Sequence, residues 1–260
     1  MIQLVPQEAM PKSCNVSGKS ASKLRQEYQT CCLACLIQPH CQSQPVRISN
    51  MTASDSSFSR EDVEIISRKS SHEGFLKVEI VQLRHRLFAG GWSADLQREL
   101  ILKDRAIGVL LFDPWRDELV LVRQFRVGMV DEEQDPWLLE LVAGMVGEGE
   151  SDEAVAMREA IEEADCKPDR LISICDYYNS PGCSNEKIAV YCGRIDSQDA
   201  GGLGGLAEEN EDIEIVVMSF DDAIAELNSG VINNAMTVIA LQWLQLNKES
   251  VVDSWCGTES

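Results

Sequence analysis

Three glutamates lie close together in the sequence, and carboxylates at their spacing could hold a divalent cation. Glu159 and Glu163 are four residues apart, so on a helix they share one face, with Glu162 beside them. Like charges this close repel one another, which an exposed helix tolerates at a cost of roughly a few tenths of a kcal/mol per pair. Alternatively, these oxygen ligands converge on Mg²⁺, whose charge removes the repulsion.

The residues around these glutamates favour the metal site. In order, the pattern is Gly144, Glu150 after five residues, then Arg158-Glu159, Ala160, Ile161 and Glu162-Glu163 after seven more. This spacing resembles the Nudix box, a long and specific motif of the Nudix hydrolase family. Asp165 departs from it, because the family has a glycine there, where the helix ends and φ is usually positive. Asp tolerates that conformation better than most residues, so we expect a small loss of stability and intact chemistry.

The resemblance extends over most of the chain, from about Asp62 to Trp255. The chain resembles the bacterial ADP-ribose pyrophosphatase branch, through "WLLELVAGMVGEGES", "NSPGCSNE", "LAEENEDIE" and "VIALQWLQL". That resemblance implies a loop–helix–loop site for Mg²⁺, in which Mn²⁺ could substitute. The implied metal ligands are the carboxylates of Glu159, Glu163 and Glu211 and the carbonyl of Ala143.

Three further residues of this region take roles from the same resemblance. Glu162 would lie at the metal, as a ligand or next to the ligands. Glu209, in the loop that carries Glu211, would be the general base that deprotonates the attacking water. Arg158 would orient the carboxylates through a salt bridge rather than contact the substrate.

Contacts with the substrate are implied for four side chains outside the motif. Arg98 and Arg126 match arginines that hold the diphosphate, and forked guanidinium groups suit phosphate oxygens. Phe75 matches an aromatic residue that stacks on adenine, and Glu186 would reach the terminal ribose. The alternatives are surface ion pairs for the two arginines and an ordinary core position for Phe75.

The implied reaction is Mg²⁺-dependent hydrolysis of ADP-ribose to AMP and ribose 5-phosphate. One alternative keeps the chemistry and changes the substrate to a GDP- or UDP-sugar, since selectivity depends on base and sugar contacts rather than on the metal motif. Another is a binding module without turnover. Such modules are expected to have lost motif carboxylates, and all of them are present here.

The surrounding pattern predicts the elements that must position these residues. Ser151 is a plausible N-cap for a helix whose apolar stripe includes Ala154, Met157 and Ile161. Apolar or alternating runs predict strands at 106–112, 118–125, 137–146, 171–178, 187–194 and 213–220. Two helical segments follow, at 221–228 and 233–249. We therefore predict an α+β fold, the Nudix α/β/α sandwich, preceded by a small N-terminal antiparallel β-sheet unit.

Composition changes divide the chain into four segments. Residues 1–60 read as a disordered leader, with Met51 a possible true start, residues 61–105 as the N-terminal β unit, 106–250 as the Nudix hydrolase domain, and 251–260 as a C-terminal tail. So small a sheet is marginal alone. In the family branch such sheets exchange between two subunits, which implies a domain-swapped homodimer.

The net charge of the chain limits the kinds of molecule that it can bind. The chain carries a formal charge of −20, which argues against nucleic acid as a partner and favours bound divalent cations. The sequence has neither a continuous apolar run long enough to cross a membrane nor the layout of a secretory signal, so we expect a cytoplasmic protein.

Two other motifs are weaker. Cys32, Cys35, His40 and Cys41 have a spacing that loosely resembles a zinc site, but no strand or helix pattern around them supports a zinc finger. The glycines of 200–206 lack the strand-to-helix turn of a phosphate-binding loop, and we expect them to let the loop close over substrate.

Overall fold

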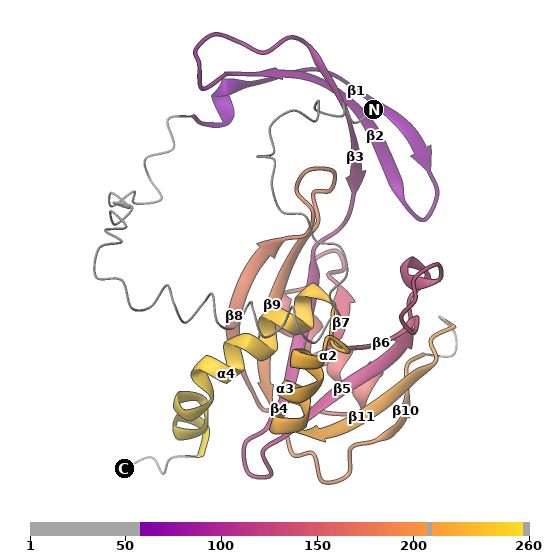
Figure 1. Ribbon diagram of the computed structural model, residues 1–260, viewed down its shortest axis with the longest axis vertical. Helices are drawn as coiled ribbons and strands as arrows, with labels where there is room; N and C mark the ends of the chain where they lie inside the picture. Colours follow the sequence, from indigo (N-terminus) through magenta and orange to yellow (C-terminus); the bar gives the residue numbers. More distant parts are fainter. Residues whose placement is uncertain (1–57, 207–209, 257–260) are drawn as a thin grey trace, which may run out of the picture. The chain divides into compact units, whose positions relative to one another are not determined.

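The computed structural model of this chain describes residues 58–206 and 210–256, as two β-sheets with helices (Figure 1). An antiparallel three-stranded sheet in the order β1-β2-β3 comes first. Its strands are β1 (Val63–Glu73), β2 (Lys77–His85) and β3 (Leu96–Leu102), after a 3₁₀ turn, η1 (Arg60–Asp62). Two hydrogen bonds link β3 to a loop of the second sheet, from Ile101 N–H to the carbonyl of Cys183 and from Asn185 N–H to the carbonyl of Ile101.

The second sheet is eight-stranded and mixed. Its main path runs β10-β11-β5-β4-β9-β8, while β6 pairs with β5 and β7 pairs with β4. The strands are β4 (Ala106–Asp113), β5 (Glu118–Phe125), β6 (Trp137–Glu140), β7 (Val142–Met145), β8 (Arg170–Tyr178), β9 (Lys187–Arg194), β10 (Gly202–Gly204) and β11 (Ile213–Ser219). The other elements are η2 (Val127–Met129) and the helices α2 (Asp152–Ala164), α3 (Phe220–Ser229) and α4 (Ala235–Cys256).

Each face of this sheet has its own hydrophobic core. Along β4 the side chains alternate, so that Leu110 and Phe112 belong to the core under α3 and α4, whereas Val109 and Leu111 belong to the core under α2. Burial on both faces explains why β4 and β5 are almost continuously apolar. The sheet between helical layers confirms the predicted α/β/α arrangement, and the separate β1–β3 sheet confirms the predicted N-terminal unit.

Helix α2 begins and ends as its sequence indicates. The Ser151 hydroxyl accepts a hydrogen bond from the Ala154 N–H at the N-terminus. At the C-terminus Asp165 has φ 49° and ψ 29°, the left-handed conformation that usually favours glycine. The Asp165 N–H donates to the carbonyl of Ile161, so aspartate closes this helix in the glycine conformation.

A strand predicted as one continuous run is divided in the structure. β4 and β5 form a ladder only from Leu111 to Asp113 and then separate. The chain enters the space between them, pairing first with β5 as β6 and then with β4 as β7. Leu141 is the residue at which it crosses over. Apolar periodicity cannot reveal such a break, because both halves are buried.

The segment from residue 251, which we expected to be a tail, is helical as far as it is described. Helix α4 continues to Cys256 and buries Val251 and Trp255 against the core. Ser254 and Trp255 also accept hydrogen bonds from arginine side chains through their carbonyls. Within the glycine-rich segment, Gly202–Gly204 form strand β10, which pairs with β11; closure of the following loop over substrate stays a prediction. The predicted leader and Met51 lie almost wholly outside the described residues.

Candidate active site

Helix α2 and strand β7 bring the motif carboxylates against the backbone of Ala143 and Gly144. Glu163 is 4% exposed, and its Oε2 accepts a hydrogen bond from the Ala143 N–H at 3.0 Å. The carboxylate of Glu159 occupies the place where a β-carbon on Gly144 would lie. A side chain at position 144 would therefore displace the carboxylate of Glu159. The motif spacing thus places the carboxylates of Glu163 and Glu159 beside the backbone of strand β7.

The electrostatics of these carboxylates are unfavourable without a counter-charge. Burial raises the pKa of Glu163 to about 8; the Ala143 N–H and Arg126 oppose this shift, while Glu159 and Glu211 add to it. Burial likewise raises the pKa of Glu159, which Arg158 opposes and Glu162 and Glu211 reinforce. Glu211 therefore raises the pKa of both of these carboxyl groups.

Arg158 is bonded to the carboxylates around it. Its Nη1 lies 2.8 Å from Glu159 Oε1 and 3.0 Å from Glu162 Oε2, and its Nε lies 3.3 Å from Glu150 Oε1. Glu150 also accepts a hydrogen bond from the Gly147 N–H, which fixes the loop before α2. These contacts agree with the predicted role of Arg158 as the residue that orients the motif carboxylates.

The loop after β10 is attached to the end of α2. Gly205 N–H donates to the carbonyl of Glu162 at 3.0 Å, and a β-carbon on Gly204 would collide with the carbonyl of Glu163. Glu211 folds back on the same loop, since its Oε2 accepts from the Leu206 N–H at 3.3 Å. These contacts hold the loop that leads to Glu211 at the C-terminal end of α2. The predicted base Glu209 lies outside the described residues.

The donor set fits a divalent cation of the magnesium type. It consists of carboxylate oxygens that raise one another's pKa, together with the Ala143 carbonyl predicted as a further ligand. Within 58–206 and 210–256, however, no three Asp, Glu, His or Cys side chains are close enough to enclose a cation. Arg158 holds Glu159 and the Ala143 N–H holds Glu163, so a cation would have to compete with these partners.

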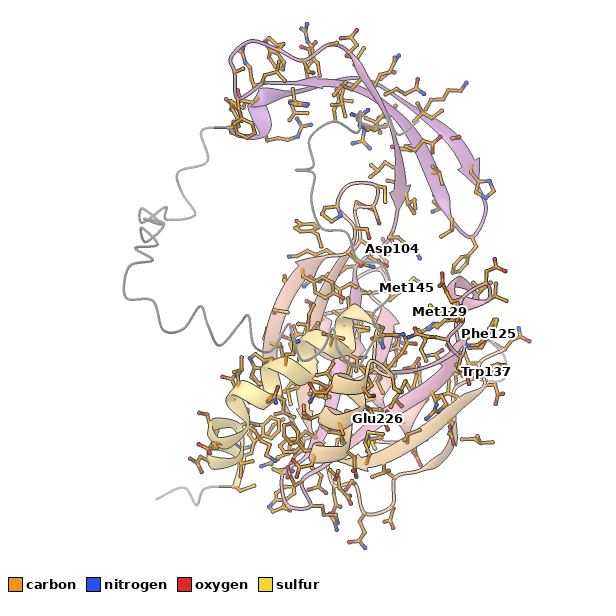
Figure 2. The ribbon with its side chains drawn as sticks, viewed as in Figure 1. Asp104, Phe125, Met129, Trp137, Met145 and Glu226 are labelled. Atoms are coloured by element: carbon orange, nitrogen blue, oxygen red, sulfur yellow. The ribbon has the colours of Figure 1, made fainter. Side chains whose placement is uncertain are left out.

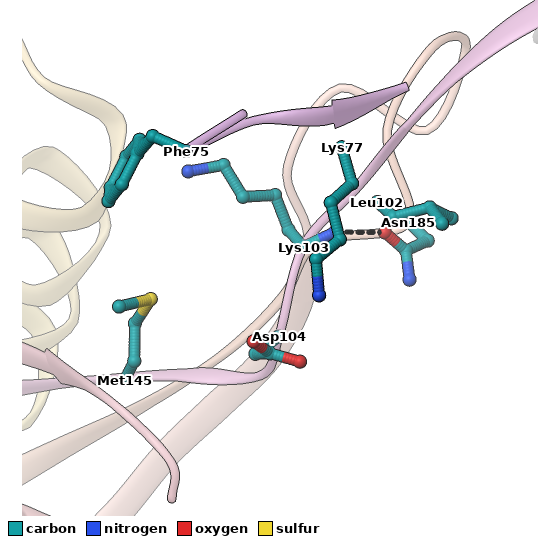
Figure 3. A pocket seen from close by; sticks show the side chains of 7 residues that line it. All are labelled: Phe75, Lys77, Leu102, Lys103, Asp104, Met145 and Asn185. Carbon is teal, nitrogen blue, oxygen red and sulfur yellow. Dashed lines mark hydrogen bonds between the residues drawn. The ribbon is translucent and has the colours of Figure 1, made fainter. Parts of the chain in front are cut away.

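A cavity of about 360 Å³ opens beside the motif. Phe75, Lys77, Leu102, Lys103, Asp104, Met145 and Asn185 line it. In Figure 3, Phe75 and Met145 lie on one side of the opening, and Lys77 and Asn185 on the other. Phe75 is 90% exposed, in the turn between β1 and β2, and Lys103 Nζ lies 5.7 Å from its ring centroid. Phe75 is therefore no core residue, and a planar base could stack on it.

The other predicted substrate contacts differ in their surroundings. Arg126 lies near the carboxylates: it lowers the pKa of Glu163 and its Nε lies 2.6 Å from Glu140 Oε2. Glu186 accepts a hydrogen bond from Asn179 Nδ2, next to the cavity residue Asn185. Arg98 lies on β3, and its Nη1 donates to the carbonyl of Gln97. It is not among the described residues that line the cavity.

Sequence reasoning missed several residues of this region. Glu140, the partner of Arg126, had a signal: it is a lone acidic residue in the apolar run "WLLELVAGMV". Nothing in the sequence marked the cavity residues Lys77, Lys103 and Asn185, because the cavity joins segments that are far apart in the chain. Arg105 had none either; it fixes the start of α2 through Asp152 and also pairs with Asp176 at 3.1 Å.

Comparison with known proteins places this site in a family. The sequence profile of the NUDIX domain matches residues 102–236. The chain is 44% identical over 198 residues to the ADP-ribose pyrophosphatase of Escherichia coli (strain K12), covering 76% of this chain and 95% of that protein. It is 43% identical over 201 residues to the ADP-ribose pyrophosphatase of Haemophilus influenzae, covering 76% and 93%.

Two further similarities are more distant. The chain is 34% identical over 151 residues to the GDP-mannose pyrophosphatase of Cronobacter sakazakii, covering 58% of this chain and 78% of that protein. A crystal structure described as an ADP compounds hydrolase superposes with a TM-score of 0.57 over 75% of this chain and 98% of that chain. At 20% identity, this structure supports the fold alone. Within the described residues, no helix is both long and apolar enough to span a membrane.

Proposed function

Because this chain belongs to the Nudix family, we propose that it is a metal-dependent hydrolase that converts ADP-ribose and water to AMP and ribose 5-phosphate. The chemistry is supported by the position of two motif carboxylates: Glu163 is buried and accepts a hydrogen bond from the Ala143 N–H, and Glu159 lies against Gly144. The choice of ADP-ribose rests on the similarity to the Escherichia coli and Haemophilus influenzae proteins, which extends over nearly their whole length.

The metal would be Mg²⁺, with Mn²⁺ as a substitute, held by Glu159, Glu163, Glu211 and the Ala143 carbonyl. A divalent cation there would neutralise charge on the diphosphate and make an attacking water more acidic. Glu162 would lie beside these ligands, and Arg158 would keep their carboxylates oriented. Glu209 is the residue to which we assign removal of the proton from the attacking water.

The remaining residues would bind and place the substrate. Stacking on the exposed ring of Phe75 would hold the adenine, since an aromatic face accepts a planar base without a specific hydrogen bond. Arg126 would hold phosphate oxygens, because it already lies at the carboxylates and 44% of its side chain is exposed. Glu186 would contact the terminal ribose.

Arg98 suits the proposal best in a homodimer. It does not line the cavity of its own chain, so it would complete the site of a second subunit through exchange of the N-terminal sheets. Two exposed features support a dimer. β1 has no buried residue. Near the end of β5, Phe125 and Trp137 pack against each other with ring centroids 5.5 Å apart, and both are about half exposed (Figure 2).

A second substrate class follows from the similarity to GDP-mannose pyrophosphatase, which is weaker and covers less of this chain. The metal site cannot separate these substrates, because the base and sugar contacts determine the choice.

The test is kcat/KM for ADP-ribose beside a panel of GDP-, UDP- and other ADP-sugars, with Mg²⁺ and with chelator, on protein purified from residue 51 onward. We expect a strong preference for ADP-ribose that chelator abolishes. Turnover of another sugar nucleotide alone would keep the chemistry and reject the substrate. Absence of turnover with every compound would favour the binding module.

A further inference from the structure

The start of helix α4 holds the crossover between β6 and β7. The Leu141 N–H donates to Thr237 Oγ1 at 3.0 Å, and Asn234 Nδ2 donates to the Leu139 carbonyl at 2.9 Å. Leu141 and Thr237 are fully buried, so water cannot replace a lost partner there. Because Leu141 lies between the two strands, the helix supplies the partner that neither strand ladder provides.

Asn234, one of the two residues that hold the crossover, also caps the first turn of α4. Asn234 Oδ1 accepts a hydrogen bond from the Thr237 N–H at 3.1 Å, and the Asn234 carbonyl accepts from the Val238 N–H at 3.0 Å. Asn234 therefore acts as the cap of α4 while its amide holds the strand. Between them, Met236 fills the space above Gly108, whose ladder partner on β7 is Ala143.

The crossover is directly joined to the candidate site on both sides. One residue before Leu141, Glu140 holds the Arg126 guanidinium at 2.6 Å. Two residues after it, the Ala143 N–H donates to Glu163 at 3.0 Å. A shift of the backbone at Leu141 would therefore move Arg126 and the Ala143 carbonyl relative to the carboxylates of α2.

We propose that Asn234 and Thr237 are positioning residues, which hold the β6–β7 crossover in the register that a divalent cation at Ala143, Glu159 and Glu163 requires. This inference rests on the proposed function. Asn234 lies within the part of the chain that the NUDIX profile matches, and Thr237 lies one residue beyond it. Outer partners of metal ligands typically change metal affinity by about 10- to 100-fold when they are removed.

The experiment measures Mn²⁺ affinity directly, by electron paramagnetic resonance of free Mn²⁺, on the full chain without substrate. Thr237→Val removes the hydroxyl at nearly constant shape, and Thr237→Ser restores it. Asn234→Asp keeps the oxygen that caps α4 and removes the amide that holds Leu139. Ser219→Ala is the matched control, since Ser219 caps α3 through the Asp222 N–H and is not among the residues that hold the crossover.

We expect the Mn²⁺ dissociation constant to rise about 10-fold in Thr237→Val and Asn234→Asp, and to stay near the wild-type value in Thr237→Ser and Ser219→Ala. Amide hydrogen exchange of the metal-free chain should increase in the peptide that contains Leu141 in the first two variants. Wild-type Mn²⁺ affinity in Thr237→Val would overturn the inference, as would an equal loss of affinity in Ser219→Ala. If the wild-type chain bound Mn²⁺ but did not hydrolyse ADP-ribose, only the proposed function would be overturned.

Discussion

The buried position of Glu163 lowers the stability of the metal-free protein when this carboxyl group is charged. A carboxylate whose pKa is raised from its ordinary value to about 8 is disfavoured in its charged form by folding. For Glu163 the sign follows directly: its contribution to stability is present below its unfolded pKa and is lost as pH rises through the folded value. At neutral pH, burial of Glu163 therefore lowers the free energy of unfolding of the metal-free protein, and a bound cation would offset this loss.

Glu163→Gln should separate the activity of this site from its stability. The amide keeps an oxygen for the Ala143 N–H and removes the charge, so kcat/KM for ADP-ribose should fall on the order of 10²- to 10³-fold. In chelator at pH 7.5 the variant should melt at the same temperature as wild type or higher. Glu153→Gln, on the exposed first turn of α2, is the control. Near-normal turnover, or a lower melting temperature in chelator, would contradict the assignment of Glu163.

At the scale of elements, glycines let strands meet helix α2. Gly144 on β7 makes room for the carboxylate of Glu159, whereas Gly204 on β10 makes room for the backbone carbonyl of Glu163. The first neighbour is the end of a side chain that can rotate. The second belongs to the helix itself and cannot move alone.

Alanine at these two positions should therefore have different effects. Gly144→Ala should displace Glu159 and reduce metal-dependent turnover, with little change in melting temperature. Gly204→Ala should force β10 from the end of α2 and lower the free energy of unfolding by about 1–3 kcal/mol. Thermal melts and kcat/KM for the two variants test this, with Gly128→Ala as the control because a β-carbon there meets nothing within 4 Å. Equal losses of stability in both variants would refute the distinction.

At the scale of the whole molecule, the β1–β3 sheet is mostly exposed or half-buried in the described chain. Only Val81 is buried in the β1–β3 sheet, although its strands include apolar residues such as Ile65 and Ile66. A two- or three-stranded sheet with exposed faces is marginal in water unless it packs on another surface. A second copy of the chain would supply that surface.

Light scattering should therefore give a mass of twice 28.9 kDa at micromolar concentration. Ile66→Lys should shift the equilibrium toward monomer, because it introduces a charge where Ile66 is 45% exposed on β1. Leu246→Lys on α4, at a site that is 84% exposed, should leave the mass unchanged. A monomeric wild-type chain at these concentrations would refute the dimer and, with it, the role of Arg98 in a shared site.

The sequence by itself determined the features that depend on local spacing. The motif from Gly144 to Glu163, the cap at Ser151 and the helix end at Asp165 could all be read from residue type and period, because such features form within a few residues of one another. The alternating apolar runs likewise gave the layers of the fold, since each strand reflects which of its faces is buried.

Only the tertiary structure decided what depends on distant segments. It divided the run at 137–146 between β6 and β7, joined Phe75 to Met145 in one cavity, and brought Thr237 to the buried N–H of Leu141. Each of these contacts links residues from different elements, and their sequence spacing carries no signal of the contact. The physical reason is that a buried backbone group must find a partner somewhere, and the fold determines which residue supplies it.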